Sequence, residues 1–163
     1  MGPASAESSD LGLNKTAETH VLVRALILDQ DHVLVCKTLD LPINFYFFPG
    51  GHIENGESAV SALLRELREE TGAECNVKRF LGCLEYIFEP GNFARCHNHK
   101  YSFLFEAESD ALKLDLSLPQ IESHLQLLWI PLNQINEIDF RPAPLKKIIP
   151  VWLKAHFNGA FGS

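Results

Sequence analysis

The order of apolar and polar positions along the chain predicts several short β-strands around one amphipathic segment. Residues 19–28 and 32–39 are β-branched runs separated by a polar DQDH turn, which predicts a β-hairpin. An aromatic strand is predicted over residues 43–48, where Pro49 and two glycines end it. Further strands are predicted over residues 78–89, 100–108 and 125–131.

Residues 58–71 have the apolar period of an α-helix rather than of a strand. Its predicted buried stripe consists of Val60, Leu63, Leu64 and Leu67. Gly72 is a natural helix stop. Residues 143–157 predict a C-terminal helix with a kink at Pro150. Many strands with one helix in the middle and one at the end predict an α+β or layered α/β/α fold with a mixed sheet.

The chain has 163 residues, 46% of them apolar and 21% charged, which is typical of one globular domain. Residues 1–17 are mostly small and polar, so we expect a flexible leader that has no part in function. We place the domain at residues 18–157 and a flexible tail at residues 158–163.

The formal net charge of −7 disfavours a long nucleic acid as partner, because the summed field repels a polyanion. A small phosphorylated metabolite stays compatible with this charge, since a bound cation inverts the local field. The four cysteines form no CxxC pair, which favours a reducing, cytoplasmic location. No apolar run is long enough to span a bilayer, so no membrane partner is expected.

Acidic residues crowd one helical segment at a spacing that costs free energy. Glu66, Glu69 and Glu70 lie on adjacent turns, where like charges cost roughly 0.2 to 0.5 kcal/mol per pair. Glu69 and Glu70 also lie in the last turn, where the helix dipole disfavours anions. A divalent cation removes both costs, so the pattern predicts a site for Mg²⁺ or Mn²⁺ on one side of the helix.

Two neighbouring features support that site. Arg65 is spaced to hold a carboxylate in orientation without binding the cation. Gly50 and Gly51 allow a tight turn and a close backbone approach, which offers a carbonyl to a cation or amides to a phosphate. The alternatives are a solvated acidic helix face and a simple surface ion pair for Arg65.

Together these residues resemble the Nudix hydrolase family. From residue 51 to residue 73 every fixed position of the Nudix box is filled, and FPGG precedes it as it usually does in the family. The filled positions are Gly51, Glu57, Arg65, Glu66, Leu67, Glu69, Glu70, Gly72 and the aliphatic Ala73. The order of the flanking strands extends the resemblance to MutT-like proteins over about residues 18 to 157.

The resemblance implies an α/β/α sandwich with a mixed sheet and a pyrophosphohydrolase activity. The expected reaction is metal-dependent hydrolysis of a diphosphate linkage in a nucleoside diphosphate joined to another moiety. By similarity, Glu69, Glu70, Glu66 and the Gly51 carbonyl bind Mg²⁺ or Mn²⁺. Glu66, Glu69 and Arg65 are the expected catalytic residues, and Glu57 and Arg65 orient the ligands.

The general base is open, because the family often takes it from outside the box. The candidates are Glu66, Glu85, Glu89, Glu106 and Glu122. Related sequences often carry a His-Glu pair where this chain has Lys100, so Lys100 is a candidate phosphate contact. Further candidate substrate contacts are Phe48, Arg95 and Arg141, and the aromatic residues 45–48 alternate between core and cleft. Zinc binding by Cys96, His97 and His99 is the disfavoured reading, because a fourth ligand is missing.

The expected partner is a small-molecule nucleotide. Pro90 lies 17 residues beyond Ala73, which leans toward an ADP-ribose or nucleotide-sugar substrate. The alternatives are a modified nucleoside triphosphate and a non-catalytic Nudix-like nucleotide-sensing domain. Dimers are common in the family, so the resemblance also allows a homodimer.

Overall fold

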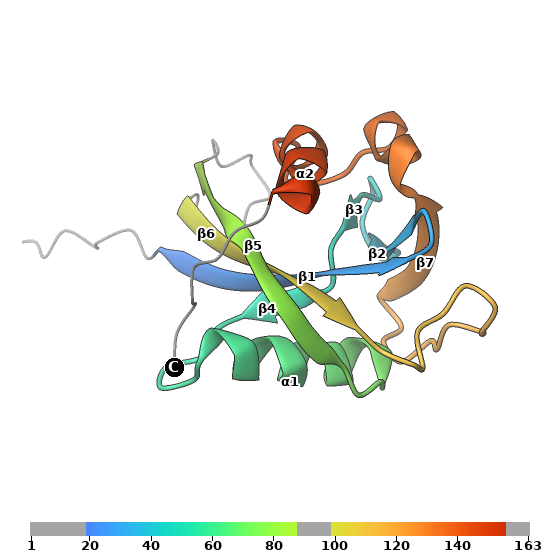
Figure 1. Ribbon diagram of the computed structural model, residues 1–163, viewed down its shortest axis with the longest axis horizontal. Helices are drawn as coiled ribbons and strands as arrows, with labels where there is room; N and C mark the ends of the chain where they lie inside the picture. Colours follow the sequence, from blue (N-terminus) through green and yellow to red (C-terminus); the bar gives the residue numbers. More distant parts are fainter. Residues whose placement is uncertain (1–18, 88–98, 156–163) are drawn as a thin grey trace, which may run out of the picture.

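The computed structural model describes residues 19–87 and 99–155. Its helices and strands follow the predicted order, with two short strands on either side of Pro49 (Figure 1). The elements are β1 (His20–Asp29), β2 (His32–Thr38), β3 (Tyr46–Phe47), β4 (Gly50–His52), α1 (Ala59–Thr71), β5 (Asn76–Ile87), β6 (His99–Glu108), β7 (Leu125–Pro131), the 3-10 helix η1 (Leu132–Glu137) and α2 (Leu145–Lys154).

Strand β1 joins the two halves of a mixed sheet. It pairs in parallel with β6 from His20↔Lys100 to Ile27↔Ala107, and β5 adds to β6 in antiparallel fashion. Its end pairs antiparallel with β2, which in turn pairs with β3 and β7. Its beginning pairs antiparallel with β4. The predicted mixed sheet is therefore confirmed.

Helices α1 and α2 cover opposite faces of this sheet (Figure 1). Because side chains alternate along a strand, β1 contributes to both cores. One core contains Val23, Ala25, Ile27, Leu63 and Leu67, and the other contains Leu26, Leu104, Leu145 and Ile149. The predicted α/β/α sandwich is confirmed.

Helix α1 begins and ends where its sequence indicates. The Ser58 hydroxyl accepts a hydrogen bond from the Ser61 amide at 3.1 Å, which caps the first turn. The helix ends at Gly72, whose φ of 68° lies in the left-handed region that glycine adopts without a steric cost. Its buried face differs in part from the predicted stripe, because Glu70 is buried while Leu64 is only half-buried.

The glycine pair after Pro49 forms strand β4 and not the predicted turn. A Cβ atom on Gly50 would overlap the carbonyl oxygen of Val23 on β1, so the close pairing of β4 with β1 requires a glycine there. The expected close backbone approach is thus present, but it is made to a neighbouring strand. The predicted aromatic strand shrinks to the two residues of β3.

Helix α2 contains Pro150 within its length, and Gly82 of β5 lies directly under the Trp152 ring. The predicted last two residues of this helix, 156 and 157, lie outside the described residues. Within residues 19–87 and 99–155, no helix has the length and apolar character needed to cross a membrane.

Candidate active site

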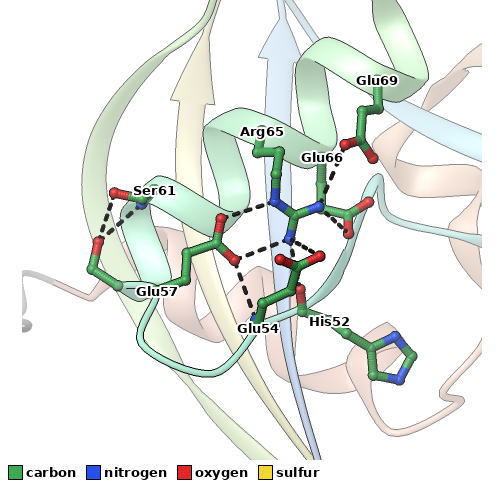
Figure 2. Close-up of polar contacts among 8 residues, drawn as sticks. His52, Glu54, Glu57, Ser61, Arg65, Glu66 and Glu69 are labelled. Atoms are coloured by element: carbon green, nitrogen blue, oxygen red, sulfur yellow. Dashed lines mark hydrogen bonds and ion pairs between the residues drawn. The ribbon is translucent and has the colours of Figure 1, made fainter.

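The guanidinium of Arg65 is the centre of a network of acids on α1 and the loop before it (Figure 2). Its Nε and Nη2 atoms donate to the two oxygens of Glu57 at 2.8 and 3.0 Å. Its Nη1 atom donates to Glu66 at 3.1 Å and lies 3.5 Å from Glu69. Its Nη2 atom also donates to the backbone carbonyl of His52 at 3.1 Å. Arg65 therefore fixes three box acids to one another and to β4.

This network changes the protonation equilibria of its members. The hydrogen bonds from Arg65 hold the pKa of Glu57 below its ordinary value, and those to Glu57 and Glu66 raise the pKa of Arg65. Glu57 stays ionised and Arg65 stays charged at neutral pH. The brace predicted for Arg65 and Glu57 has the geometry that role requires.

Glu70 lies on the inner side of α1, with only 9% of its surface exposed. Its Oε2 atom accepts a hydrogen bond from the Gly50 amide at 2.8 Å. Burial raises the pKa of Glu70 to about 8, although the nearby Arg24 and the Gly50 amide oppose that shift. A carboxylate in such a place needs a positive charge close by to stay ionised at neutral pH.

Glu66 packs against the other glycine of β4. A Cβ atom on Gly51 would overlap the Glu66 carboxyl group, so glycine makes room for this side chain beside the backbone. Burial raises the pKa of Glu66, and its ion pair with Arg65 opposes the shift. Two box acids, Glu66 and Glu70, are thus pressed against the two glycines that precede the box loop.

Arg24 of β1 is a component of the site that the sequence pattern did not single out. Its Nη1 atom donates to the carbonyls of Phe48 and Gly50 at 3.1 and 2.9 Å, on either side of Pro49. Burial lowers its pKa, and Glu70 is the largest opposing influence. One signal was available: Arg24 is a lone charged residue inside the apolar run of residues 19–28.

The predicted acidic patch is divided between two environments. The Glu70 side chain is buried against β4, whereas the Glu69 side chain is 53% exposed. Neighbouring helical positions differ by about 100° in direction, and α1 turns the Glu70 side onto β4. The patch was predicted to lie beside the buried face, but Glu70 is part of that face.

The donor set has the chemistry that a hard divalent cation requires, since it offers carboxylate oxygens whose charge burial disfavours. In the described part of the chain, however, no three acid, histidine or cysteine side chains already converge as metal ligands. Arg65 draws Glu66 and Glu69 toward itself instead. The residues fit Mg²⁺ or Mn²⁺ by donor type and charge.

A cavity of about 740 Å³ adjoins β4. Its walls include residues of all seven strands that the structure describes and of the segment between η1 and α2. They include Arg24, Thr38, Phe45, Phe47, Gly50, Gly51, His52, Tyr86, Lys100, Ser102, His124, Asp139 and Arg141. At the rim, His52 Nε2 lies 2.7 Å from His20 Nδ1, and burial lowers the pKa of His52.

The structure sorts the predicted substrate contacts. Lys100 and Arg141 line the cavity. Phe48 does not: it is 1% exposed and packs edge-on against Phe140 in the α2 core, so its prediction as a substrate contact is corrected. Because successive side chains of residues 45–48 point to opposite sides, Phe45 and Phe47 line the cavity instead. Arg95 lies outside the described residues.

The candidate bases outside the box have partners of their own. Glu85 accepts hydrogen bonds from His99 and Tyr101, both at 2.8 Å. Glu106 pairs with Arg79 at 2.6 Å, and Glu122 pairs with His124. Glu89 lies outside the described residues, as do Cys96 and His97 of the zinc hypothesis. Among the described candidates, Glu66 is the one packed against Gly51 of the cavity wall.

The domain is an α/β/α sandwich in which an acidic helix packs against a glycine-rich strand beside a cavity. A model of the NUDIX domain matches residues 18–151, which is more than half of the chain. The chain belongs to the NUDIX family.

Its curated relatives are similar over part of their length. The chain is 35% identical over 80 residues to the Xenopus laevis protein "Nucleoside diphosphate-linked moiety X motif 6", covering 47% of this chain and 37% of that one. It is 32% identical over 94 residues to an ADP-ribose pyrophosphatase of Methanocaldococcus jannaschii, covering 57% of this chain and 54% of that one. The chain therefore spans less than two thirds of either relative.

A solved NUDIX hydrolase from Nitrosomonas europaea superimposes with a TM-score of 0.67 at 19% identity, over 88% of this chain and 100% of that chain. At this identity the likeness concerns the fold.

Proposed function

We propose that this chain is a pyrophosphohydrolase that cleaves the diphosphate linkage of a nucleoside diphosphate joined to a second group. The observation that carries the proposal is the packing of Glu66 and Glu70 against Gly51 and Gly50, at the wall of the cavity. Hydrolysis of a diphosphate requires neutralisation of its oxygens and a water positioned in line with the phosphorus. Carboxylates gathered beside a cavity wall meet both requirements once a cation is bound.

The proposed cofactor is Mg²⁺ or Mn²⁺, held by Glu66, Glu69, Glu70 and the Gly51 carbonyl. When bound, it supplies the positive charge that the phosphoryl oxygens and the buried carboxylates both need. The raised pKa values of Glu66 and Glu70 support this assignment, because they mark negative charge that the protein alone compensates poorly.

The side chains of the site would position the ligands and accept the proton of the attacking water. Arg65 keeps Glu57, Glu66 and Glu69 in place through its three donor nitrogens. Glu66 is the proposed base that accepts a proton from the attacking water, because it is the described candidate that packs against Gly51 of the cavity wall. The water oxygen forms the new bond to phosphorus as the bridging P–O bond breaks. The products are two phosphate monoesters.

An ADP-ribose or nucleotide-sugar substrate is the proposed class. The similarity to an ADP-ribose pyrophosphatase supports it, as does a cavity lined by both aromatic and cationic side chains. Pro90, which first suggested this class, lies outside the described residues. A non-catalytic sensing domain is disfavoured because every acid of the box is present.

The test is a substrate panel with Mg²⁺ or Mn²⁺, comprising ADP-ribose, nucleotide sugars, dinucleoside polyphosphates and modified nucleoside triphosphates. We expect hydrolysis that a chelator abolishes, with a nucleoside monophosphate as one product. Glu69→Gln should lower turnover by roughly a hundredfold. Glu74→Gln is the matched control, because Glu74 is an exposed acid just beyond α1 that pairs with Arg68. Turnover that persists in chelator or in Glu69→Gln would contradict the proposal.

A further inference from the structure

Part of the cavity wall is a series of two aromatic side chains between two cationic ones. The Arg24 guanidinium lies 5.2 Å from the Phe47 ring centre, and the Phe47 and Phe45 rings are 5.9 Å apart. The Arg141 guanidinium lies 4.4 Å from the Phe45 ring centre. This series leads from Gly50, whose carbonyl accepts a hydrogen bond from Arg24, to Arg141 at its other end.

The far end of the series consists of Phe45, Arg141 and Asp139. Arg141 Nε and Nη2 donate to the two oxygens of Asp139 at 3.0 and 2.8 Å. This bidentate pair compensates the charge of Arg141 and fixes the plane of its guanidinium over the phenyl ring. Half of the Arg141 side chain stays exposed, at 50%.

The backbone holds this unit in place. The Arg141 amide donates to the Tyr46 carbonyl at 2.8 Å, and the Tyr46 amide donates to the Asp139 carbonyl at 2.9 Å. The Phe45 amide donates to the hydroxyl of Thr38 at 3.0 Å. Two segments nearly a hundred residues apart in sequence are thus joined on both sides of the stacked pair. These side chains are already ordered before a ligand binds, so binding costs little conformational entropy.

The chemistry of the two ends differs. At the β4 end, Arg24, His52 and Lys100 line the cavity beside the acids, so this end suits phosphates. At the other end the positive charge of Arg141 is already paired with Asp139, and Asp139 repels an anion. An uncharged planar ring gains from stacking on a guanidinium or phenyl face without needing a net charge.

We propose that Phe45 and Arg141, braced by Asp139, form the seat on which the nucleobase of the substrate stacks. The nucleobase then lies at the Arg141 end of the cavity and the diphosphate at the Gly51 end. This inference rests on the proposed function for its substrate class. It makes Arg141 a contact of the nucleobase and not of a phosphate.

Binding of product-like ligands tests the seat without requiring turnover. Calorimetry would compare AMP and UMP with ribose 5-phosphate, which has the same phosphate and sugar but no base. The variants are Phe45→Leu, which keeps apolar volume but removes the π face, and Arg141→Lys, which keeps the charge but removes the plane. Arg68→Lys is the matched control, because Arg68 makes the same bidentate pair with Glu74 at 2.8 and 2.9 Å.

We expect the unmodified chain to bind AMP or UMP more tightly than ribose 5-phosphate. Phe45→Leu and Arg141→Lys should each weaken binding of that nucleotide by about tenfold, the scale of one lost stacking contact, and leave ribose 5-phosphate unchanged. Arg68→Lys should change neither. Thermal melting of each variant shows that the fold is intact.

The inference is overturned if both variants weaken ribose 5-phosphate as much as the nucleotide, because Arg141 then serves the phosphate. It is also overturned if neither AMP nor UMP binds better than ribose 5-phosphate. Failure of the proposed function gives a different result. In that case nucleotide binding still depends on Phe45 and Arg141, but no member of the substrate panel is hydrolysed.

Discussion

The backbone amide of Gly50 and the carboxylate of Glu70 are joined by a hydrogen bond of 2.8 Å across 20 residues of sequence. This contact fastens the last turn of α1 to strand β4. It also places an acid under the glycine pair and next to the buried Arg24, where burial disfavours its ionised form. The stability of the metal-free protein therefore depends on the protonation of one side chain.

The first prediction concerns the pH dependence of that stability. The pKa of Glu70 is about 8 in the folded state against an ordinary value of 4.5, so the folded state binds this proton more tightly than the unfolded state. Its contribution is complete below the ordinary value and is lost as pH rises through about 8. In Glu70→Gln the amide oxygen still accepts from Gly50 and nothing titrates.

We therefore expect Glu70→Gln to gain stability relative to the unmodified chain, by up to a few kcal/mol, as pH rises from about 5 to about 8.5. Denaturant melts in the presence of a chelator measure this difference. Subtracting the two proteins removes the contributions of all other acids. A constant difference across this pH range would show that Glu70 titrates normally.

A second prediction uses the close packing of Gly51 and Glu66. In Gly51→Ala the new methyl group displaces the flexible Glu66 carboxyl group, so the fold survives and the proposed base moves. We expect turnover to fall at least about tenfold with little change in melting temperature. The measurement is kcat on the substrate that the panel identifies.

Gly56→Ala is the control for this substitution. Its Cβ meets nothing within 4 Å, but its φ of 79° is strained for alanine. The control should therefore lose about 1 kcal/mol of stability and keep its kcat. Equal kcat values for the two variants would contradict the role given to Glu66.

The third prediction concerns Arg65. The substitution Arg65→Lys keeps the positive charge. It removes the planar guanidinium that holds Glu57, Glu66 and Glu69 together. We expect the Mg²⁺ concentration for half-maximal activity to rise by about ten- to a hundredfold. A Mg²⁺ titration of activity measures this. Arg68→Lys, which breaks a similar fork at the end of α1, should leave the titration unchanged.

The fourth prediction concerns Arg24. Arg24→Met leaves the carbonyls of Phe48 and Gly50 without this donor and removes the positive charge that lowers the pKa of Glu70. We expect a loss of about 3 kcal/mol in the free energy of unfolding at about pH 9, where Glu70 is ionised in the unmodified chain, measured by denaturant melts without metal. The double variant Arg24→Met/Glu70→Gln should recover part of this loss, because the acid is then neutral. Strictly additive losses would show that the two residues do not interact.

Features set by neighbouring residues could be read from the sequence. The spacing of Leu63 and Leu67 and the stop at Gly72 predicted α1, because a helix face and a helix end depend on a few adjacent positions. The strand order predicted the mixed sheet. The spacing of the box acids and Arg65 predicted the family, and the family model matches residues 18–151.

The tertiary structure decided how these residues are used. Glu69 and Glu70 are adjacent in sequence, yet one is exposed and the other is buried, because β4 packs under only one side of α1. Phe48 lies in the core and Phe45 lies at the cavity wall. Which of the two is buried depends on the pairing of β3 with β2 and with the segment at Phe140. The contacts of Phe45 with Arg141 and of Arg24 with the Gly50 carbonyl join distant segments of the chain. Such contacts depend on how strands and loops pack in space, which a local pattern of residue types does not encode.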